Sequence, residues 1–188
     1  MRSKIEVSFL AFLSVLFVFG CTTEKTTSLS SNATTGEGFN EIHDSGTGMY
    51  LRWKFATSNV TFEVSGETSG WVAVGFEPSS QMNNANIIIG YVENGVVTIS
   101  DDFGNSGSSH AKDTSSGGTN NLSAVTGNET NGITTIRFTI PQNSGDSRDK
   151  TLVSGQTYTV MLAKSSADDL TTAHTGNRSG RTSFSLKL

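Results

Sequence analysis

An all-β fold, with antiparallel strands packed as a β-sandwich, is the fold class that the sequence predicts. Apolar and polar residues alternate along most of the chain after residue 50, as half-buried antiparallel strands require. Asn-Gly pairs stand between some of these runs, where tight turns are expected. No window of helical length carries an apolar stripe with the helical period, so helices are not expected.

Five alternating runs predict strands with one buried face. They cover residues 51–55, 60–64, 136–140, 158–162 and 184–188. In each run the apolar side chains fall on one face and the polar side chains on the other. Met161 stands out of phase with its apolar neighbours, so we expect it to pack on the second face of its strand.

Two further segments, 71–76 and 87–92, are apolar almost throughout. They predict central strands that are covered on both faces. Asn94-Gly95 is a strong hairpin signal, because both residues tolerate positive φ, and Asn131-Gly132 is a weaker second one. Residues 102–121 are polar and rich in Gly and Ser, and this composition indicates a surface loop.

The N-terminus, residues 1–21, has the pattern of an export signal. Arg2 and Lys4 precede an apolar stretch over 9–19, which is too short to span a bilayer as a helix. Gly20 then stands before Cys21, and this ending resembles the bacterial lipobox, in which the cysteine is lipidated. The sequence therefore predicts a protein anchored to the cell envelope outside the cytoplasm, on the periplasmic or the outer surface. The alternative is a simple secretory signal with an incidental cysteine.

Composition limits what the rest of the chain does. Residues 22–38 are rich in Thr, Ser, Asn and Gly and predict a flexible linker to a single domain over 39–188. Because Cys21 is the only cysteine, the domain holds no disulfide and no cysteine-based metal site. A net charge of -4 with scattered basic residues argues against a nucleic-acid partner.

Three blocks of sequence together resemble the DOMON domain, the dopamine β-monooxygenase N-terminal-like module. The first is Gly-Trp-Val-Ala-Val-Gly-Phe at 70–76, followed by a methionine-bearing loop and the apolar strand at 87–91. The second is Asn-Gly-Ile-Thr-Thr-Ile-Arg-Phe at 131–138, with 152–160 after it. The third runs from Ser-Ala-Asp-Asp-Leu at 166–170 through His-Thr-Gly-Asn-Arg at 174–178 to the last strand.

The resemblance implies an immunoglobulin-like β-sandwich with haem or sugar as its ligand. In haem-binding members, a loop methionine and a late histidine are the axial ligands of a non-covalent haem b, and these positions match Met82 and His174. Such a pair fills both axial positions of the iron, which suits electron transfer. Arg178 and Arg181 are candidates to bind the haem propionates, and Trp71 is a candidate to line the cofactor cavity.

Plainer interpretations of these residues stay open. Met82 is also explained as a loop methionine that fills an apolar gap, and His174 as a surface histidine. Arg178 and Arg181 are also explained as solvated cations, and Trp71 as an ordinary core residue. If the pocket holds sugar instead, Trp71, Trp53 or Tyr91 would offer a stacking face.

Other candidate residues indicate less. His43 and His110 lie in polar segments without a partner at a metal-ligand spacing, so both are expected to be solvated. Asp101-Asp102 with Asp113 lacks the pattern of a calcium-binding loop, so these carboxylates are also expected to be solvated.

No nucleophile, phosphate-loop or dinucleotide motif is present, so the sequence does not predict an enzyme. We expect an electron-transfer domain that works with an unidentified redox partner and reaches the membrane through Cys21. The alternative is a module that binds a sugar or another small molecule without redox chemistry.

Overall fold

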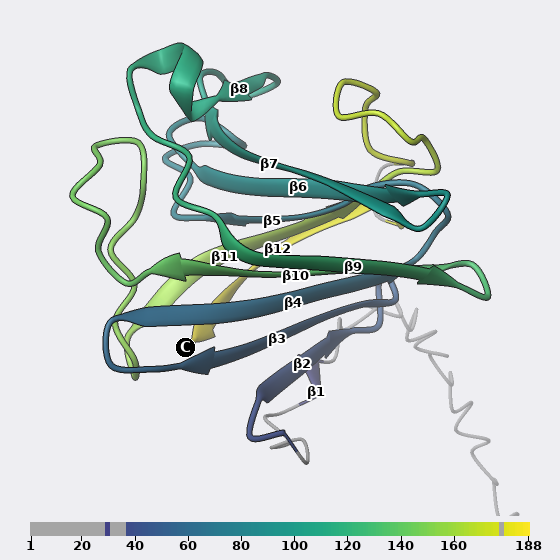
Figure 1. Ribbon diagram of the computed structural model, residues 1–188, viewed down its shortest axis with the longest axis horizontal. Coiled ribbons are helices and arrows are strands. Elements are labelled where there is room, and N and C mark those ends of the chain that lie inside the picture. Colours follow the sequence, from purple (N-terminus) through teal and green to yellow (C-terminus); the bar gives the residue numbers. More distant parts are fainter. Residues whose placement is uncertain (1–28, 31–36, 177–178) are drawn as a thin grey trace, which may run out of the picture.

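The computed structural model describes residues 29–30, 37–176 and 179–188. Within them the chain forms two antiparallel sheets stacked face to face, so the predicted all-β sandwich is confirmed (Figure 1). Strands of the first sheet, in spatial order, are β1 (Leu29–Ser30), β2 (Asn40–Asp44), β3 (Met49–Phe55), β4 (Asn59–Glu67), β10 (Ile133–Pro141) and β9 (Ser123–Thr130). Strands of the second sheet are β12 (Arg181–Lys187), β11 (Thr157–Lys164), β5 (Val72–Phe76), β6 (Asn86–Glu93), β7 (Val96–Gly104) and β8 (His110–Lys112).

The described residues contain one helical turn, the 3-10 turn η1 at Asp113–Ser116. Within this part of the chain no helix is long and apolar enough to cross a membrane.

The predicted loop over 102–121 is only partly a loop, because it contains the end of β7, strand β8 and η1. Strand β1 lies inside the predicted linker 22–38 and pairs with β2. The predicted signal segment with Cys21 lies outside the described residues.

Both predicted hairpins are present. Asn94 and Gly95 have φ of 51° and 77° and join β6 to β7. Asn131 and Gly132 have φ of 55° and 73° and join β9 to β10 in the same way. Positive φ at both central residues gives a turn whose twist matches that of the paired strands. The weaker signal, Asn131-Gly132, thus predicted its turn as well as the stronger one, Asn94-Gly95, did.

The main core lies between the two sheets, and Phe62 of β4 is at its centre. Its ring lies 5.0 Å from that of Phe76 in the opposite sheet and 5.8 Å from that of Phe138 on the neighbouring strand. All three side chains are fully buried. Phe62 therefore joins β4 and β10 to the central strand β5 of the second sheet.

The outer face of the first sheet is polar and carries a line of alternating charges. Arg52 forms ion pairs with Glu41 and Glu63, and Glu63 also pairs with Arg137. Each of these residues stands directly opposite the next across β2, β3, β4 and β10, and opposite charges in such positions stabilise a sheet. These charged side chains therefore neutralise one another on this face.

Replacement of Phe138 by alanine tests the core. Because the side chain is fully buried, we expect Phe138→Ala to lower the free energy of unfolding by about 3–5 kcal/mol in urea denaturation. Val153→Ala is the control, since Val153 is 45% exposed, and its effect should stay within about 0.5 kcal/mol. Equal effects of the two substitutions would contradict the placement of the core.

Candidate functional site

The second sheet is apolar on its outer face as well. Strand alternation sends Val72, Val74 and Phe76 of β5 into the main core and Trp71 and Ala73 to the outside. The buried residues of this outer cluster are Trp71, Ala73, Ala85, Ile87 and Ile89, and Met82, Tyr91, Met161, Ala163 and Leu170 pack against them. We call this set the outer apolar cluster. Segments 71–76 and 87–92 are thus covered on both faces, and Met161 packs on the second face, both as predicted.

The loop over 77–85, which carries Met82, is tied to the end of β7. Asn84 N donates to Gly104 O over 2.6 Å, and Gly104 N donates to Ala85 O over 2.9 Å. The loop closes on itself where Ala85 N donates to Met82 O over 3.1 Å. A Cβ at residue 104 would overlap the Met82 carbonyl, so only glycine allows this close approach. The backbone of Met82 is therefore held against the sheet.

The segment after β11, residues 165–176, covers the other end of the cluster. Trp71 Nε1 donates to Thr172 O over 3.1 Å, and Leu170 packs against the cluster. The carboxylate of Asp169 accepts hydrogen bonds from the backbone of Thr171 and Thr172, which fixes the turn before His174. The hydroxyls of Thr172 and Thr171 also donate to this carboxylate. These side-chain bonds, with the backbone bonds after them, keep the pKa of Asp169 well below its usual range.

One nitrogen of the His174 imidazole carries a proton, and the other carries a lone pair that accepts a hydrogen bond. Its Nδ1 lies 3.1 Å from Gly176 O, and because a carbonyl only accepts, this nitrogen carries the proton. Nε2 is then the acceptor of a 2.9 Å hydrogen bond from Arg181. A histidine that binds a metal through one nitrogen is usually oriented by a hydrogen bond from its other, protonated nitrogen. In His174 this is the bond from Nδ1 to Gly176 O. Arg181, a predicted propionate partner, lies beside the predicted ligand, and Arg178 falls outside the described residues.

Met82 and His174 approach from opposite ends of the sheet. Lys164, where the His174 segment begins, pairs with Val72 at the start of β5. Asn86, where the Met82 loop ends, pairs with Phe76 at the other end of β5. The two segments therefore do not meet at one end of the sandwich. What the two segments share is the outer face of the second sheet, which they border from its two ends.

Comparisons with known proteins agree with this arrangement. The model of the DOMON domain matches residues 45–165, which is more than half of the chain. The chain belongs to the DOMON family. Its fold is similar to the cytochrome b domain of pyranose dehydrogenase from Coprinopsis cinerea, with 18% identity and a TM-score of 0.59 over 84% of this chain and 86% of that one. It is also similar to the cytochrome domain of Myriococcum thermophilum cellobiose dehydrogenase, with 12% identity and a TM-score of 0.61 over 87% and 90%.

The outer apolar cluster of this DOMON chain is chemically suited to a haem. Its floor combines bulky Ile87 and Ile89 with the small residues Ala73 and Ala163, and most of it is closed to water. A thioether reaches it from one loop, and an imidazole with a lone pair lies in the segment that covers its other end. Thioether and imidazole are ligand types that haem iron accepts together.

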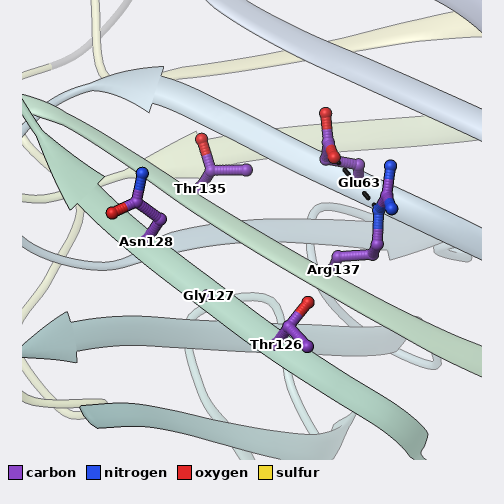
Figure 2. Close-up of a pocket in the computed structure, with 6 residues that line it drawn as sticks. All are labelled: Glu63, Thr126, Gly127, Asn128, Thr135 and Arg137. Carbon is purple, nitrogen blue, oxygen red and sulfur yellow. Dashed lines mark hydrogen bonds and ion pairs between the residues drawn. The ribbon is translucent and has the colours of Figure 1, made fainter. Parts of the chain in front are cut away.

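Two of the three aromatic residues predicted to stack on a sugar are buried. Trp53 is fully buried in the main core, and Trp71 is 4% exposed with its indole nitrogen already bonded. Neither offers the stacking face expected of it, whereas Tyr91, the third candidate, is only half-buried at the edge of the outer apolar cluster. A hollow of about 320 Å³ lies on the other sheet (Figure 2). Its lining residues, none of them aromatic, are Glu63, Thr126, Gly127, Asn128, Thr135 and Arg137.

The two remaining histidines have partners. His43 stacks on Tyr50 with ring centroids 4.2 Å apart. His110 Nδ1 lies 2.6 Å from a carboxylate oxygen of Asp102, and its side chain is 21% exposed. The prediction of a solvated His110 was wrong, because strand β8 brings it against β7.

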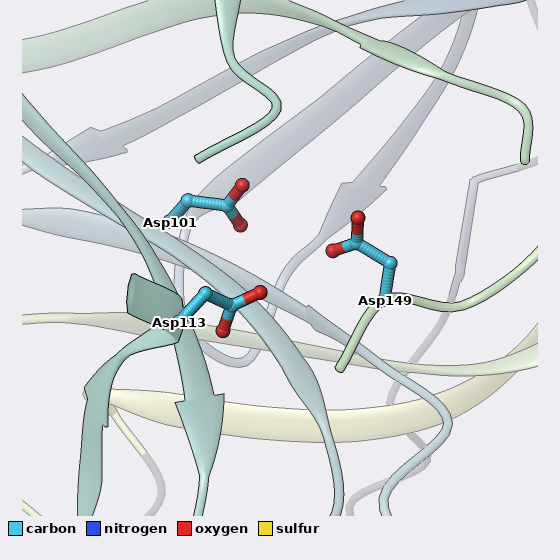
Figure 3. Close-up of side chains that lie close together, drawn as sticks. All are labelled: Asp101, Asp113 and Asp149. Atoms are coloured by element: carbon cyan, nitrogen blue, oxygen red, sulfur yellow. The ribbon is translucent and has the colours of Figure 1, made fainter. Parts of the chain in front are cut away.

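The acids of β7 and η1 are also buried, contrary to the expectation of solvated carboxylates. Asp101, Asp102 and Asp113 are each exposed by 4% or less. Asp102 faces His110, whereas Asp101 and Asp113 face Asp149 from the loop over 142–156 (Figure 3). One carboxylate oxygen of each lies within 4.8 Å of those of the other two. We call Asp101, Asp113 and Asp149 the acidic cluster. No pattern in the sequence indicates that Asp149 belongs to it.

Burial raises the pKa values of these carboxyl groups. The pKa of Asp101 rises to about 7, mainly by desolvation and also by repulsion from Asp149, Asp113 and Asp102. The pKa of Asp113 rises to about 6, again mainly by desolvation, although the charge of Arg148 opposes this. Desolvation also raises the pKa of Asp149.

These shifts predict how stability depends on pH when the protein is kept in EDTA. Between about pH 4 and 7 the folded state holds protons that the unfolded chain has released, so the free energy of unfolding should fall as pH rises. Urea denaturation at pH 5 and 7.5 measures this loss. Asp101→Asn should reduce it, whereas Asp168→Asn, at an exposed aspartate, should not. An equal loss in wild type and Asp101→Asn would contradict the assignment.

Proposed function

We propose that this chain is an exported, lipid-anchored electron-transfer domain that binds a b-type haem through Met82 and His174. The observation that carries the proposal is the outer apolar cluster, bordered at its two ends by the segments that carry these residues. Membership of the DOMON family supports it, as does similarity in fold to two domains whose names describe them as cytochrome domains.

Each part of the site has a defined task in this proposal. When bound, the haem supplies reversible one-electron chemistry at its iron. The Met82 sulfur and the His174 Nε2 would bind the iron. The Met82 loop is kept in place by backbone hydrogen bonds, and the imidazole by its bond to Gly176 O. Trp71, Ile87 and Ile89 exclude water from the floor of the site. A dry environment strengthens electrostatic interactions and favours a stable, fully coordinated iron.

Arg181 would change partner when haem binds. Its guanidinium donates to His174 Nε2, the nitrogen that the iron would take. Released from the imidazole, the guanidinium is free to bind a propionate carboxylate, for which its planar donor set is well suited. Arg178 is the second candidate for this task. Both residues are therefore proposed to fix the orientation of the haem.

Absorption spectra test the ligand assignment. Wild-type protein produced with adequate haem should give a sharp Soret band and resolved α and β bands after reduction with dithionite, as a six-coordinate low-spin haem does. Met82→Ala and His174→Ala should each lose this low-spin signature, because each removes one axial ligand. His43→Ala, at a histidine stacked on Tyr50 in the first sheet, should keep it.

The outcome also separates the proposal from its alternative. An unchanged low-spin spectrum in Met82→Ala would overturn the ligand assignment. A folded, colourless wild-type protein that does not take up added hemin would favour the non-redox binding module. The hollow of Figure 2 would then be the place to search for a sugar or another polar ligand, by thermal shift.

Export and anchoring rest on the first 21 residues and are tested separately. In a bacterial host, wild-type protein should fractionate with membranes, incorporate labelled fatty acid and be released by proteolytic removal of its N-terminus. Cys21→Ser removes the thiol that would be lipidated, so the label should be lost. Equal labelling of wild type and Cys21→Ser would refute the anchor. If the chain is exported as proposed, its redox partner would lie in the same extracytoplasmic compartment.

A further inference from the structure

The acidic cluster is assembled from three separate parts of the chain. Asp101 comes from β7, Asp113 begins η1, and Asp149 comes from the loop between β10 and β11. Figure 3 shows the three carboxylates turned toward a common space. Like charges so close together repel one another strongly in a buried site. Bound protons or a bound cation must therefore offset this repulsion.

Asp149 has hydrogen-bond partners, but hydrogen bonds within the described structure do not satisfy the carboxylates of Asp113 and Asp101. Both side-chain oxygens of Asp113 are buried without a hydrogen-bond partner, and so is Oδ1 of Asp101. The other oxygen of Asp101 accepts one hydrogen bond, from Asn121 N over 2.9 Å. A buried polar atom without a partner is costly, and a buried charge more so. Three such oxygens in one place indicate a missing positive partner.

Asn86 provides an independent observation beside the acids. It is neutral and 2% exposed, and its Nδ2 donates to Asp149 Oδ1 over 3.0 Å. Its own Oδ1 is buried and has no hydrogen-bond partner. The amide thus contacts the cluster and keeps an unused oxygen, and amide oxygens are ordinary ligands of hard cations.

Basic side chains do not supply the missing charge. None of the ion pairs formed within the described residues involves a member of the acidic cluster. Arg148, whose charge acts on Asp113 without an ion pair, makes its direct contacts elsewhere. Its Nε donates to Ser116 O over 3.0 Å, and its guanidinium lies 4.8 Å from the centre of the Phe103 ring.

We propose that the acidic cluster, with the Asn86 amide oxygen, is a binding site for one calcium ion. All the donors are oxygens, which selects a hard cation over zinc, copper or iron. Calcium accepts six to eight oxygens in flexible geometry, and opposite oxygens in its coordination sphere are about 4.6–5.2 Å apart. The carboxylate spread fits within this sphere. Backbone carbonyls and water would complete it.

Such an ion would join three separate parts of the chain. It would fasten η1 and the 142–156 loop to the end of β7, next to the point where Gly104 bonds the Met82 loop. The inference is independent of the haem proposal, because none of its ligands contacts iron in that proposal. Calcium binding can therefore be measured on haem-free protein.

The experiment compares calcium with chelator on purified full-length protein. Calorimetric titration at pH 7.5 should show one calcium bound per chain. At a calcium concentration about a hundred times the dissociation constant, Tm should rise by about 5–10 °C over its value in EDTA. Asp113→Asn and Asp149→Asn should each lose the titration signal and the Tm response. Asp168→Asn, an exposed aspartate outside the cluster, should keep both.

Several results would overturn the proposal. One is wild-type protein that gives the same Tm in calcium and EDTA and shows no binding. Another is a response to magnesium but not to calcium. A third is calcium binding that survives in Asp113→Asn and Asp149→Asn. If either variant is unfolded in circular dichroism, Asn86→Ala, which keeps all three acids, replaces it and should weaken binding at least tenfold.

Discussion

The burial of strand β5 on both faces is the constraint on which the rest of the structure depends. Its inward side chains pack against Phe62 and complete the main core. The outward side chains of Ala73 on the strand and of Trp71 just before it are equally apolar and cannot be left in water without cost. The loop over 77–85 and the segment over 165–176 therefore fold back onto the sheet. In doing so they bring a thioether to the cluster and an imidazole to its border.

The first sheet has the other kind of outer face, one that does not need to be covered. Its outer face is polar, and the charges of Arg52, Glu63 and Arg137 are paired along the strands. Nothing needs to cover such a face, and no loop that carries a predicted ligand lies on it. The difference between the two sheets explains why the proposed haem site is on the second one. The hollow on the first sheet is polar for the same reason.

Local patterns predicted the strands, and both hairpin turns, because period-two alternation and Asn-Gly pairs act between neighbours in sequence. The doubly covered segments could be recognised for the same reason. The opposite approach of Met82 and His174 could not, because it depends on β11 pairing with β5 in antiparallel register. The acidic cluster was missed because Asp149 reaches Asp101 only after the chain has crossed to the first sheet and started back in the loop between β10 and β11. Spacing in sequence carries no trace of such a meeting.

The two proposed sites meet at the same strand ends. Asn86, which contacts the acidic cluster, directly follows Ala85, which closes the Met82 loop. Gly104, which bonds that loop, lies three residues beyond Asp101 on β7. An ion that orders this corner would also restrict the Met82 backbone. Haem binding would then cost less conformational entropy, because this backbone would already be ordered. Since coupling between two ligands is reciprocal, each is expected to favour the binding of the other. The loop sequence alone would then not set how firmly Met82 is held, because the carboxylates behind it would contribute.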